Sequence, residues 1–138
     1  MKPRVIKIAR VPEALTQQLT DRYSVEDVGP NPDPERLQVV ASGARAVVAN
    51  GESVVSEGLI AALPDLELIA VCGVGYDGVN VAAAGARGIH VTNTPNVLTD
   101  DVADLAIGLL IATARQLHGA DMHRGLMCRY LEDLRVGA

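Results

Sequence analysis

Three closely spaced glycines mark the segment of this sequence whose residue types most clearly suggest chemistry. Gly73-Val74-Gly75-Tyr76-Asp77-Gly78 fits the pattern G-x-G-x-x-G, follows an apolar run and precedes a helical pattern. This is the setting of a dinucleotide-binding loop. Small residues let backbone N–H groups converge on an anion, and such a group of donors can bind a carboxylate as well as a phosphate. Glycines that only make a tight turn are the alternative interpretation.

The residues beyond this loop decide between the possible ligands. A dinucleotide site needs an acidic residue about 20 positions further on, at the end of the next strand, to bind the ribose hydroxyls. The next apolar run is Ile89-His90-Val91-Thr92-Asn93, and no Asp or Glu lies between Asp77 and Asp100. Asp77 itself adds a negative charge inside the loop that would repel a pyrophosphate. These features favour an organic acid over a nucleotide as the ligand.

The remaining candidates for catalysis are two cysteines and three histidines, Cys72, Cys128, His90, His118 and His123. The cysteines have no metal-ligand spacing and form no disulfide framework, and we expect Cys72 to be a buried, inert thiol at the end of a strand. None of the histidines has a partnering carboxylate at a suitable spacing, so we interpret them as solvated or core residues. We therefore predict no catalytic residue and no metal site within this chain.

The elements that position the glycine loop follow from alternating patterns. Short runs rich in Val and Ile predict strands over residues 4–9, 23–28, 45–50, 66–72 and 88–92. Helical patterns lie between them, over residues 12–22, 34–42, 56–63 and 79–86. Strands alternating with helices imply a parallel sheet covered on both faces, and right-handed crossovers give a flavodoxin-like, doubly wound α/β fold. The expected strand order is 2-1-3-4-5.

A long helix and a tail follow this lobe of residues 1–100. Thr99 is a good N-cap, and Asp100 and Asp101 suit the positive end of a helix better than a metal site. We predict a helix over residues 101–118 and a short amphipathic helix within the tail, residues 119–138. The apolar stretch 102–114 includes Asp104 and is shorter than the roughly 20 residues that cross a bilayer. We therefore expect a buried helix and no membrane association.

The composition of the 138-residue chain fits this fold and excludes other function classes. Hydrophobic residues make up 49% of the sequence, and Phe and Trp are absent, so Val, Leu, Ile and Ala must form the core. The formal net charge of −5 gives no basic surface for nucleic acid. The first apolar run is too short for a secretory signal. A cytoplasmic protein is expected.

The stretch from Leu68 to Arg115 resembles one family closely. It combines the G-V-G-x-D turn of residues 73–77, the run A-x-x-x-G-I-x-V-x-N-T-P of residues 84–95, and the V-A-D sequence of residues 102–104. Their order and spacing resemble the D-isomer-specific 2-hydroxyacid dehydrogenases of the glyoxylate/hydroxypyruvate reductase type. The resemblance extends over about residues 4–115 and implies the substrate-binding lobe of such an enzyme. Asn96 departs from the pattern, because members often have Gly there.

The resemblance also implies roles for individual residues. The amides of a small group would bind a 2-hydroxy or 2-oxo acid, namely Asn50, Gly51, Gly73, Val74 and Gly75. Leu98, Thr99 and Val102 would approach the nicotinamide of NAD(P). In the family, the nucleotide lobe and the catalytic arginine, carboxylate and histidine follow the long helix, but no second glycine fingerprint follows Arg115 here. We therefore expect the chain alone to bind no cofactor and to be inactive.

Two other functions remain open. The chain could be a free-standing small-acid-binding or regulatory module on a flavodoxin-like scaffold, although Asn50 stands where a phosphoreceiver needs an aspartate. It could also act through its helix, because apolar side chains would form an exposed patch there, namely Leu105, Ile107, Leu109, Leu110 and Ile111. This predicts a homodimer through the helix 101–118, or exchange of that helix between two chains.

Overall fold

The computed structural model of the protein describes residues 2–30, 32–117 and 119. It divides the chain into a first unit that ends at Asn96 and a second unit that begins at Val97. The elements of the first unit are, in order, β1 (Arg4–Lys7), α1 (Glu13–Arg22), β2 (Ser24–Asp27), α2 (Pro34–Ala41), β3 (Ala44–Asn50), α3 (Glu57–Ala62), β4 (Leu68–Cys72), α4 (Val81–Ala86) and β5 (His90–Thr92). All five predicted strands and the four predicted helices are present, and their ends differ from the prediction by at most two residues.

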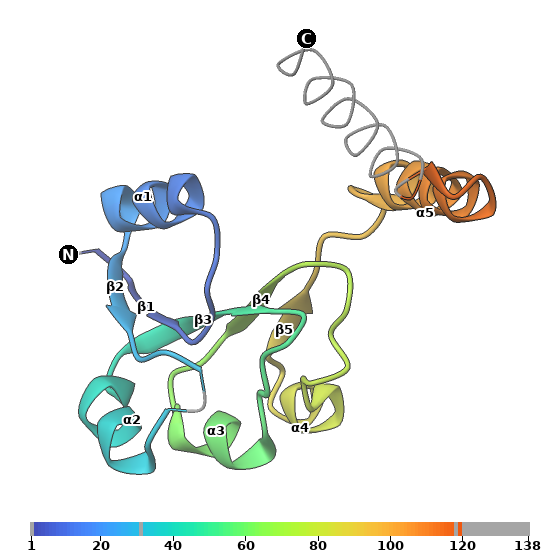
Figure 1. The fold of residues 1–138 in the computed structure, drawn as a ribbon. Helices are drawn as coiled ribbons and strands as arrows, with labels where there is room; N and C mark the ends of the chain where they lie inside the picture. Colours follow the sequence, from blue (N-terminus) through green and yellow to red (C-terminus); the bar gives the residue numbers. More distant parts are fainter. Residues whose placement is uncertain (1, 31, 118, 120–138) are drawn as a thin grey trace, which may run out of the picture. The chain divides into compact units, whose positions relative to one another are not determined.

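The five strands form one parallel sheet in the order β2-β1-β3-β4-β5. Helix α1 lies on one face of the sheet, and α2, α3 and α4 lie on the other (Figure 1). This confirms the predicted flavodoxin-like α/β fold. The connections after β1 and β3, two neighbouring strands, therefore leave toward opposite faces.

Branched aliphatic side chains fill the core between the sheet and its helices. The largest fully buried ones are Ile6, Ile8, Val47, Val55, Ile60, Leu63 and Ile69. Strand β4 shows the alternation of a sheet directly, because Ile69 and Val71 are buried while Leu68, Ala70 and Cys72 are half-exposed. The prediction of a buried Cys72 was therefore wrong: its position in β4 places it on the less covered face of the sheet.

The three helices α2, α3 and α4, which share one face of the sheet, are capped by side chains, as short helices require. Asp33 accepts a hydrogen bond from the Glu35 amide at the start of α2, and Ser56 accepts one from the Leu59 amide at the start of α3. Asn80 accepts from the Ala83 amide at the start of α4. These local bonds explain why helices of six to eight residues form here.

The guanidinium of Arg87, just after α4, binds the carboxyl end of α3. It donates hydrogen bonds to the backbone carbonyls of Ile60, Leu63 and Pro64. The Ile60 and Leu63 carbonyls also accept from the backbone amides of Leu63 and Leu66, so the arginine adds a charged donor to a helix end that is already closed by its own backbone. It also ties α4 to α3 across the lower face of the sheet.

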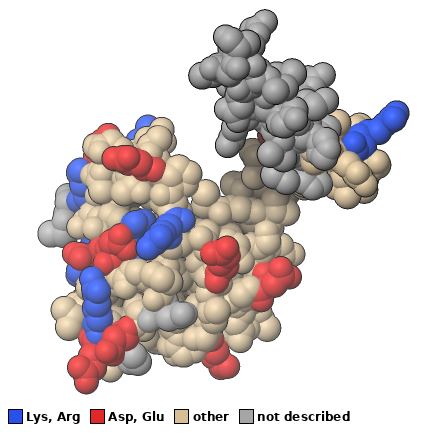
Figure 2. All heavy atoms as spheres, in the orientation of Figure 1, with Lys and Arg blue, Asp and Glu red and all other residues tan. Residues whose placement is uncertain are grey.

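An ion pair joins the first two strands. The Lys7 ammonium lies 2.7 Å from the Asp27 carboxylate, and these residues are register partners across β1 and β2. The hydrogen bond from Lys7, helped by the Gly29 amide, lowers the pKa of Asp27 below its ordinary value. On the face seen in Figure 2, basic and acidic side chains are interspersed on part of the surface, and other acidic side chains stand alone.

The second unit contains α5 (Thr99–Ala114). The predicted N-cap was wrong by one position: Leu98 precedes the first helical residue, and the Thr99 side chain makes no capping hydrogen bond. The helix was also expected to be buried, but none of its residues is, and Leu110 exposes 70% of its surface. Among the described residues, no helix is long and apolar enough to span a membrane. The predicted tail helix lies, except for Gly119, outside the described residues.

Candidate functional site

The carboxyl ends of β3 and β4 bring two loops together. Asn50 and Cys72 are register partners at the last positions of these strands, so Gly51 and Gly73 leave the sheet side by side. A side chain on Gly73 would start 3.5 Å from the Gly51 nitrogen, and one on Gly51 would start 3.5 Å from the Gly75 carbonyl oxygen. Glycine at these positions allows the two backbones to approach closely.

The glycine loop is held from the end of β5. The Gly73 amide donates to the Thr94 hydroxyl at 3.1 Å, and the Thr94 amide donates to the Gly73 carbonyl at 2.9 Å. The Asn93 side-chain amide donates to the Val74 carbonyl at 2.8 Å. Gly73 itself adopts φ 148°, in the region that favours glycine. The loop is therefore a fixed structure rather than a free connection.

Several amides of this loop remain available. Within the described part of the chain, the N–H groups of residues 74–78 donate to no acceptor, and neither does that of Gly51. The Gly73 amide is already used by Thr94. Successive backbone N–H groups in a turn form a concave site for an anion. The structure thus offers Val74 and Gly75 as donors, with Gly51 beside them.

The Asn50 side chain organises the facing turn. Its Oδ1 accepts from the Glu52 amide at 3.1 Å and from the Ser53 hydroxyl at 2.8 Å, while the Ser53 Oγ accepts from the Asn50 amide at 3.0 Å. Its Nδ2 donates to the Arg10 carbonyl at 3.4 Å. The buried Ser53 is thus fully hydrogen-bonded. Asn50 shapes the turn that presents the Gly51 amide.

The third glycine of the pattern has a structural role. A side chain on Gly78 would collide with the backbone carbonyl of Ser53, because the two loops run alongside each other. The Val55 amide donates to the Gly78 carbonyl at 2.9 Å, and the Asn80 amide donates to the Val55 carbonyl at 3.0 Å. Gly78 is therefore required for packing between the loops rather than for a ligand.

The residues of this loop do not fit a dinucleotide. The following helix, α4, has six residues and begins three positions after Gly78, and its Ala83 amide is already capped by Asn80. The Asp77 carboxylate lies 3.6 Å from where a Gly75 side chain would start, and it opposes a phosphate dianion more strongly than a single carboxylate. The absence of an acidic ribose ligand between Asp77 and Asp100 agrees with this geometry.

The other residues singled out in the sequence are not brought to this site. His90 is exposed on β5, and Cys72 lines a small apolar pocket beside α1, with Leu15, Leu19 and Thr94. The described residues contain no group of three or more potential metal ligands. His118, His123 and Cys128 lie outside the described residues.

The start of the second unit carries the three residues predicted to face a nicotinamide. Leu98 precedes α5, and Thr99 and Val102 lie in its first turn. Leu98 and Val102 are exposed. At the end of the first unit, Asn96 has φ 62°, the left-handed conformation that glycine adopts most easily and that asparagine tolerates. The family's preference for Gly at this position thus has a local backbone cause.

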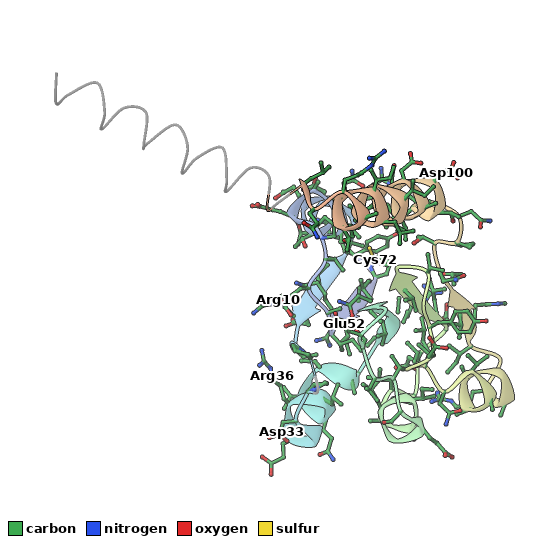
Figure 3. All side chains as sticks on the ribbon, turned by 45° about the vertical axis from the view of Figure 1, so that its right-hand side comes forward. Arg10, Asp33, Arg36, Glu52, Cys72 and Asp100 are labelled. Carbon is green, nitrogen blue, oxygen red and sulfur yellow. The ribbon has the colours of Figure 1, made fainter. Side chains whose placement is uncertain are left out.

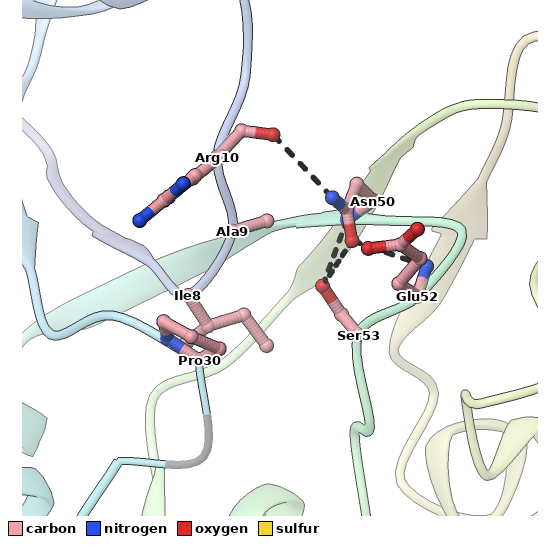
Figure 4. A pocket seen from close by; sticks show the side chains of 7 residues that line it. All are labelled: Ile8, Ala9, Arg10, Pro30, Asn50, Glu52 and Ser53. Atoms are coloured by element: carbon pink, nitrogen blue, oxygen red, sulfur yellow. Dashed lines mark hydrogen bonds between the residues drawn. The ribbon is translucent and has the colours of Figure 1, made fainter.

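Three residues of the site were missed in the sequence. Asn93 and Thr94 belong to the N-T-P run, and their position directly after a strand was a signal that they could reach a neighbouring loop. Arg10 follows β1 in the same way, and its side chain lines a cavity that also includes Asn50 and Ser53 (Figure 4). The hydrogen bond from the Asn50 side chain to the Arg10 carbonyl shows that the two residues are neighbours.

Comparison with known families gives an extended match. Residues 5–130 match the family described as D-isomer specific 2-hydroxyacid dehydrogenase, catalytic domain. A glyoxylate reductase of Thermococcus kodakarensis is 42% identical over 125 residues, which cover 88% of this chain and 37% of that protein. The chain spans between 35% and 39% of the length of the first curated relatives that it matches.

Solved structures agree with this result. A 2-hydroxyacid dehydrogenase from Ketogulonicigenium vulgare Y25 superposes with a TM-score of 0.82 at 40% identity, covering 88% of this chain and 38% of that one. An NADPH-dependent glyoxylate/hydroxypyruvate reductase from Sinorhizobium meliloti, in complex with NADP and malonate, gives a TM-score of 0.69 at 38% identity, covering 82% and 34%.

Proposed function

The chain belongs to the D-isomer-specific 2-hydroxyacid dehydrogenase family, and we propose that it is the substrate-binding part of an NAD(P)-dependent 2-oxoacid reductase. The proposed substrate is a small 2-oxo or 2-hydroxy acid of the glyoxylate or hydroxypyruvate type. The observation that supports this best is the run of loop amides that donate to no acceptor, of which those of Val74 and Gly75 lie nearest the strand end, beside Gly51. Successive N–H donors of this kind form a small concave site that suits a carboxylate anion.

The residues would act by holding the acid rather than by transferring hydride. The amides of Val74 and Gly75 would bind the carboxylate, while Thr94 and Asn93 keep their loop in place. Asn50 would position the Gly51 amide at the same cleft. Fixing the carboxylate would orient the neighbouring carbonyl, which is the contribution of a binding site to catalysis by orientation.

We propose that this chain by itself does not reduce the acid. The nicotinamide cofactor supplies hydride in such enzymes, and the loop of residues 73–78 does not fit it. Reduction also requires an acid within hydrogen-bond reach of the carbonyl oxygen. Mixing the chain with NADH or NADPH and glyoxylate or hydroxypyruvate tests this, and sustained oxidation of the cofactor would overturn it.

Acid binding can be tested by NMR with the ¹⁵N-labelled chain. We expect glyoxylate and glycolate to shift the amide signals of Gly51, Val74 and Gly75, and the neutral glycolamide to leave them in place. Val74→Pro removes one N–H donor and should weaken glycolate binding, whereas Val74→Ala keeps the donor and serves as the control. Equal shifts with glycolate and glycolamide, or shifts elsewhere only, would refute the site.

An associated proposal concerns α5. Its large apolar side chains are all exposed, with Leu105, Ile107 and Leu110 exposing 63%, 56% and 70% of their surfaces. Exposed apolar surface of this kind favours association, so we propose a homodimer through residues 101–118. Light scattering at micromolar concentration should give twice the chain mass, and Ile107→Glu with Leu110→Glu should restore the single mass. A monomer for the unaltered chain would contradict the proposal.

A further inference from the structure

One face of the sheet is only partly covered by helices. Among the described residues of the first unit, α1 is the helix on this face, and its Leu15 and Leu19 line a pocket of about 210 Å³ over β3 and β4 (Figure 1). The side chains that alternate onto this face from β4 and β5 are half-exposed or exposed, and Figure 3 labels one of them, Cys72, at the end of β4. We call this set the open face, namely Leu68, Ala70, Cys72, His90 and Thr92.

Strand β4 has the composition of a strand that is covered on both sides. Its Ile69 and Val71 are buried against the face that carries α2, α3 and α4, and its three residues on the open face are apolar as well. Parallel strands that are apolar on both faces are typical of sheets with helices on both sides. The open face also contains no acidic residue, lysine or arginine. It therefore suits an apolar helix.

Helix α5 needs more apolar cover than one helix can give. Its large apolar side chains are all exposed, and a helix that is apolar on most sides is normally buried. At helical spacing they form two rows on nearly opposite sides, one of Val102, Leu105 and Leu109 and the other of Ile107, Leu110 and Ile111. Pairing with a single helix covers only one of these rows. The other row requires a second apolar surface.

We propose that the open face is the docking site for α5 of a second copy of this chain, so that two copies exchange the helix. The inference rests on the homodimer proposed above and names the surface that its helix contacts. In each copy, one row of α5 packs on the partner's β4 and β5, and the other row packs on the partner's α5. The contact is then the same in both directions, as a twofold dimer requires.

The connection before α5 favours exchange between copies over docking within one chain. Thr94 is hydrogen-bonded to the glycine loop through both its hydroxyl and its amide. Only residues 95–98 therefore remain between this fixed point and Thr99, the first residue of α5. Pro95, in this connection, restricts the backbone further because its φ is fixed. A short, stiff connection makes it difficult for the chain to reverse onto its own sheet, and such connections promote exchange of an element between copies.

Light scattering on variants of the full 138-residue chain tests the docking surface. Ala70→Glu places an unpaired charge in the middle of the open face, so we expect it to convert the dimer at micromolar concentration to the single chain mass with an unchanged circular dichroism spectrum. Val39→Glu is the matched control and should stay dimeric, because Val39 is exposed on α2, on the other face of the sheet. A folded Ala70→Glu variant that remains dimeric would overturn the docking surface alone, whereas a monomeric unaltered chain would overturn the homodimer as well.

Disulfide cross-linking identifies what covers the open face, even if Ala70→Glu does not fold. One chain carries Cys128→Ser and keeps only Cys72, and a co-expressed chain carries Cys72→Ser and Cys128→Ser with a new cysteine on one row of α5, Leu109→Cys or Leu110→Cys.

Oxidation with copper phenanthroline should link the two chains for at least one of the rows. It should not link them for Asp104→Cys, the control, because Asp104 lies between the two rows on the polar side of α5. No link from either row would overturn the proposal. A disulfide within one chain that carries Cys72 together with Leu109→Cys or Leu110→Cys, at the single chain mass, would overturn the exchange and assign the open face to the chain's own helix.

Discussion

Replacing Gly78 by alanine places a methyl group against the backbone of Ser53. This substitution tests whether Gly78 is needed for packing between the loops or for binding a ligand. The nearest atoms to the added carbon are the Ser53 carbonyl oxygen and its carbon, the latter at 3.1 Å. Because these atoms belong to the backbone, they cannot rotate away. The two loops must move apart, or the strain must remain.

The expected loss of stability has two contributions. Overpacking of a tight contact costs about 1 to 3 kcal/mol. Separation of the loops also weakens the hydrogen bonds that link Val55 with Gly78 and Asn80, each worth about 0.5 to 1.5 kcal/mol. Together these give a decrease in the free energy of unfolding of about 2 to 6 kcal/mol, a large part of the roughly 5 to 15 kcal/mol of a typical domain.

Urea unfolding followed by circular dichroism measures this effect. A loss of about 4 kcal/mol lowers the urea midpoint by roughly 2 M for an ordinary dependence on denaturant. Gly85→Ala is the matched control, because Gly85 lies in α4 with nothing within 4 Å of the added carbon. It should stabilise the protein by up to about 1 kcal/mol. If Gly78→Ala unfolds at the same urea concentration as the unaltered chain, the packing role assigned to Gly78 is wrong.

Three other predictions concern contacts in the first unit. Arg87→Ala should lower stability by about 2 to 4 kcal/mol, because it removes three hydrogen bonds from a charged donor to the end of α3 and the loop after it. Arg87→Lys should recover only part of this loss in the same urea assay. The pKa of Asp27 is lowered beside Lys7, so this pair stabilises the fold at pH values above the ordinary pKa of an aspartate, and the contribution is lost as the pH falls through the lower folded-state pKa. Between pH 6 and pH 2, the unfolding temperature should therefore decrease less for Asp27→Asn than for the unaltered chain. Thr94→Val removes the acceptor of the Gly73 amide. It should weaken glycolate binding severalfold and lower the free energy of unfolding by about 1 kcal/mol. Glycolate binding equal to that of the unaltered chain would contradict the positioning role of Thr94.

Much of the fold could be predicted from the sequence because its signals are local. Val-rich and Ile-rich runs separated by helical patterns indicate a parallel sheet, and the handedness of crossovers restricts the possible strand orders. The glycine loop could also be located from the sequence, and the proposal that it binds an acid and no nucleotide starts from the absence of Asp and Glu between Asp77 and Asp100, a feature of the sequence alone.

Features that depend on neighbours distant in sequence required the tertiary structure. The sequence could not show that Gly78 packs on Ser53, 25 positions earlier, or that Thr94 engages the Gly73 amide. The exposure of Cys72 depended on which face of the sheet has more helices. The predicted strand order already made β1 and β3 neighbours, but only the structure shows that the turns after them enclose a cavity lined by Arg10 and Glu52. Local patterns determine which elements form, but the side chains that share a site are decided only when separate strand ends meet at one edge of the sheet.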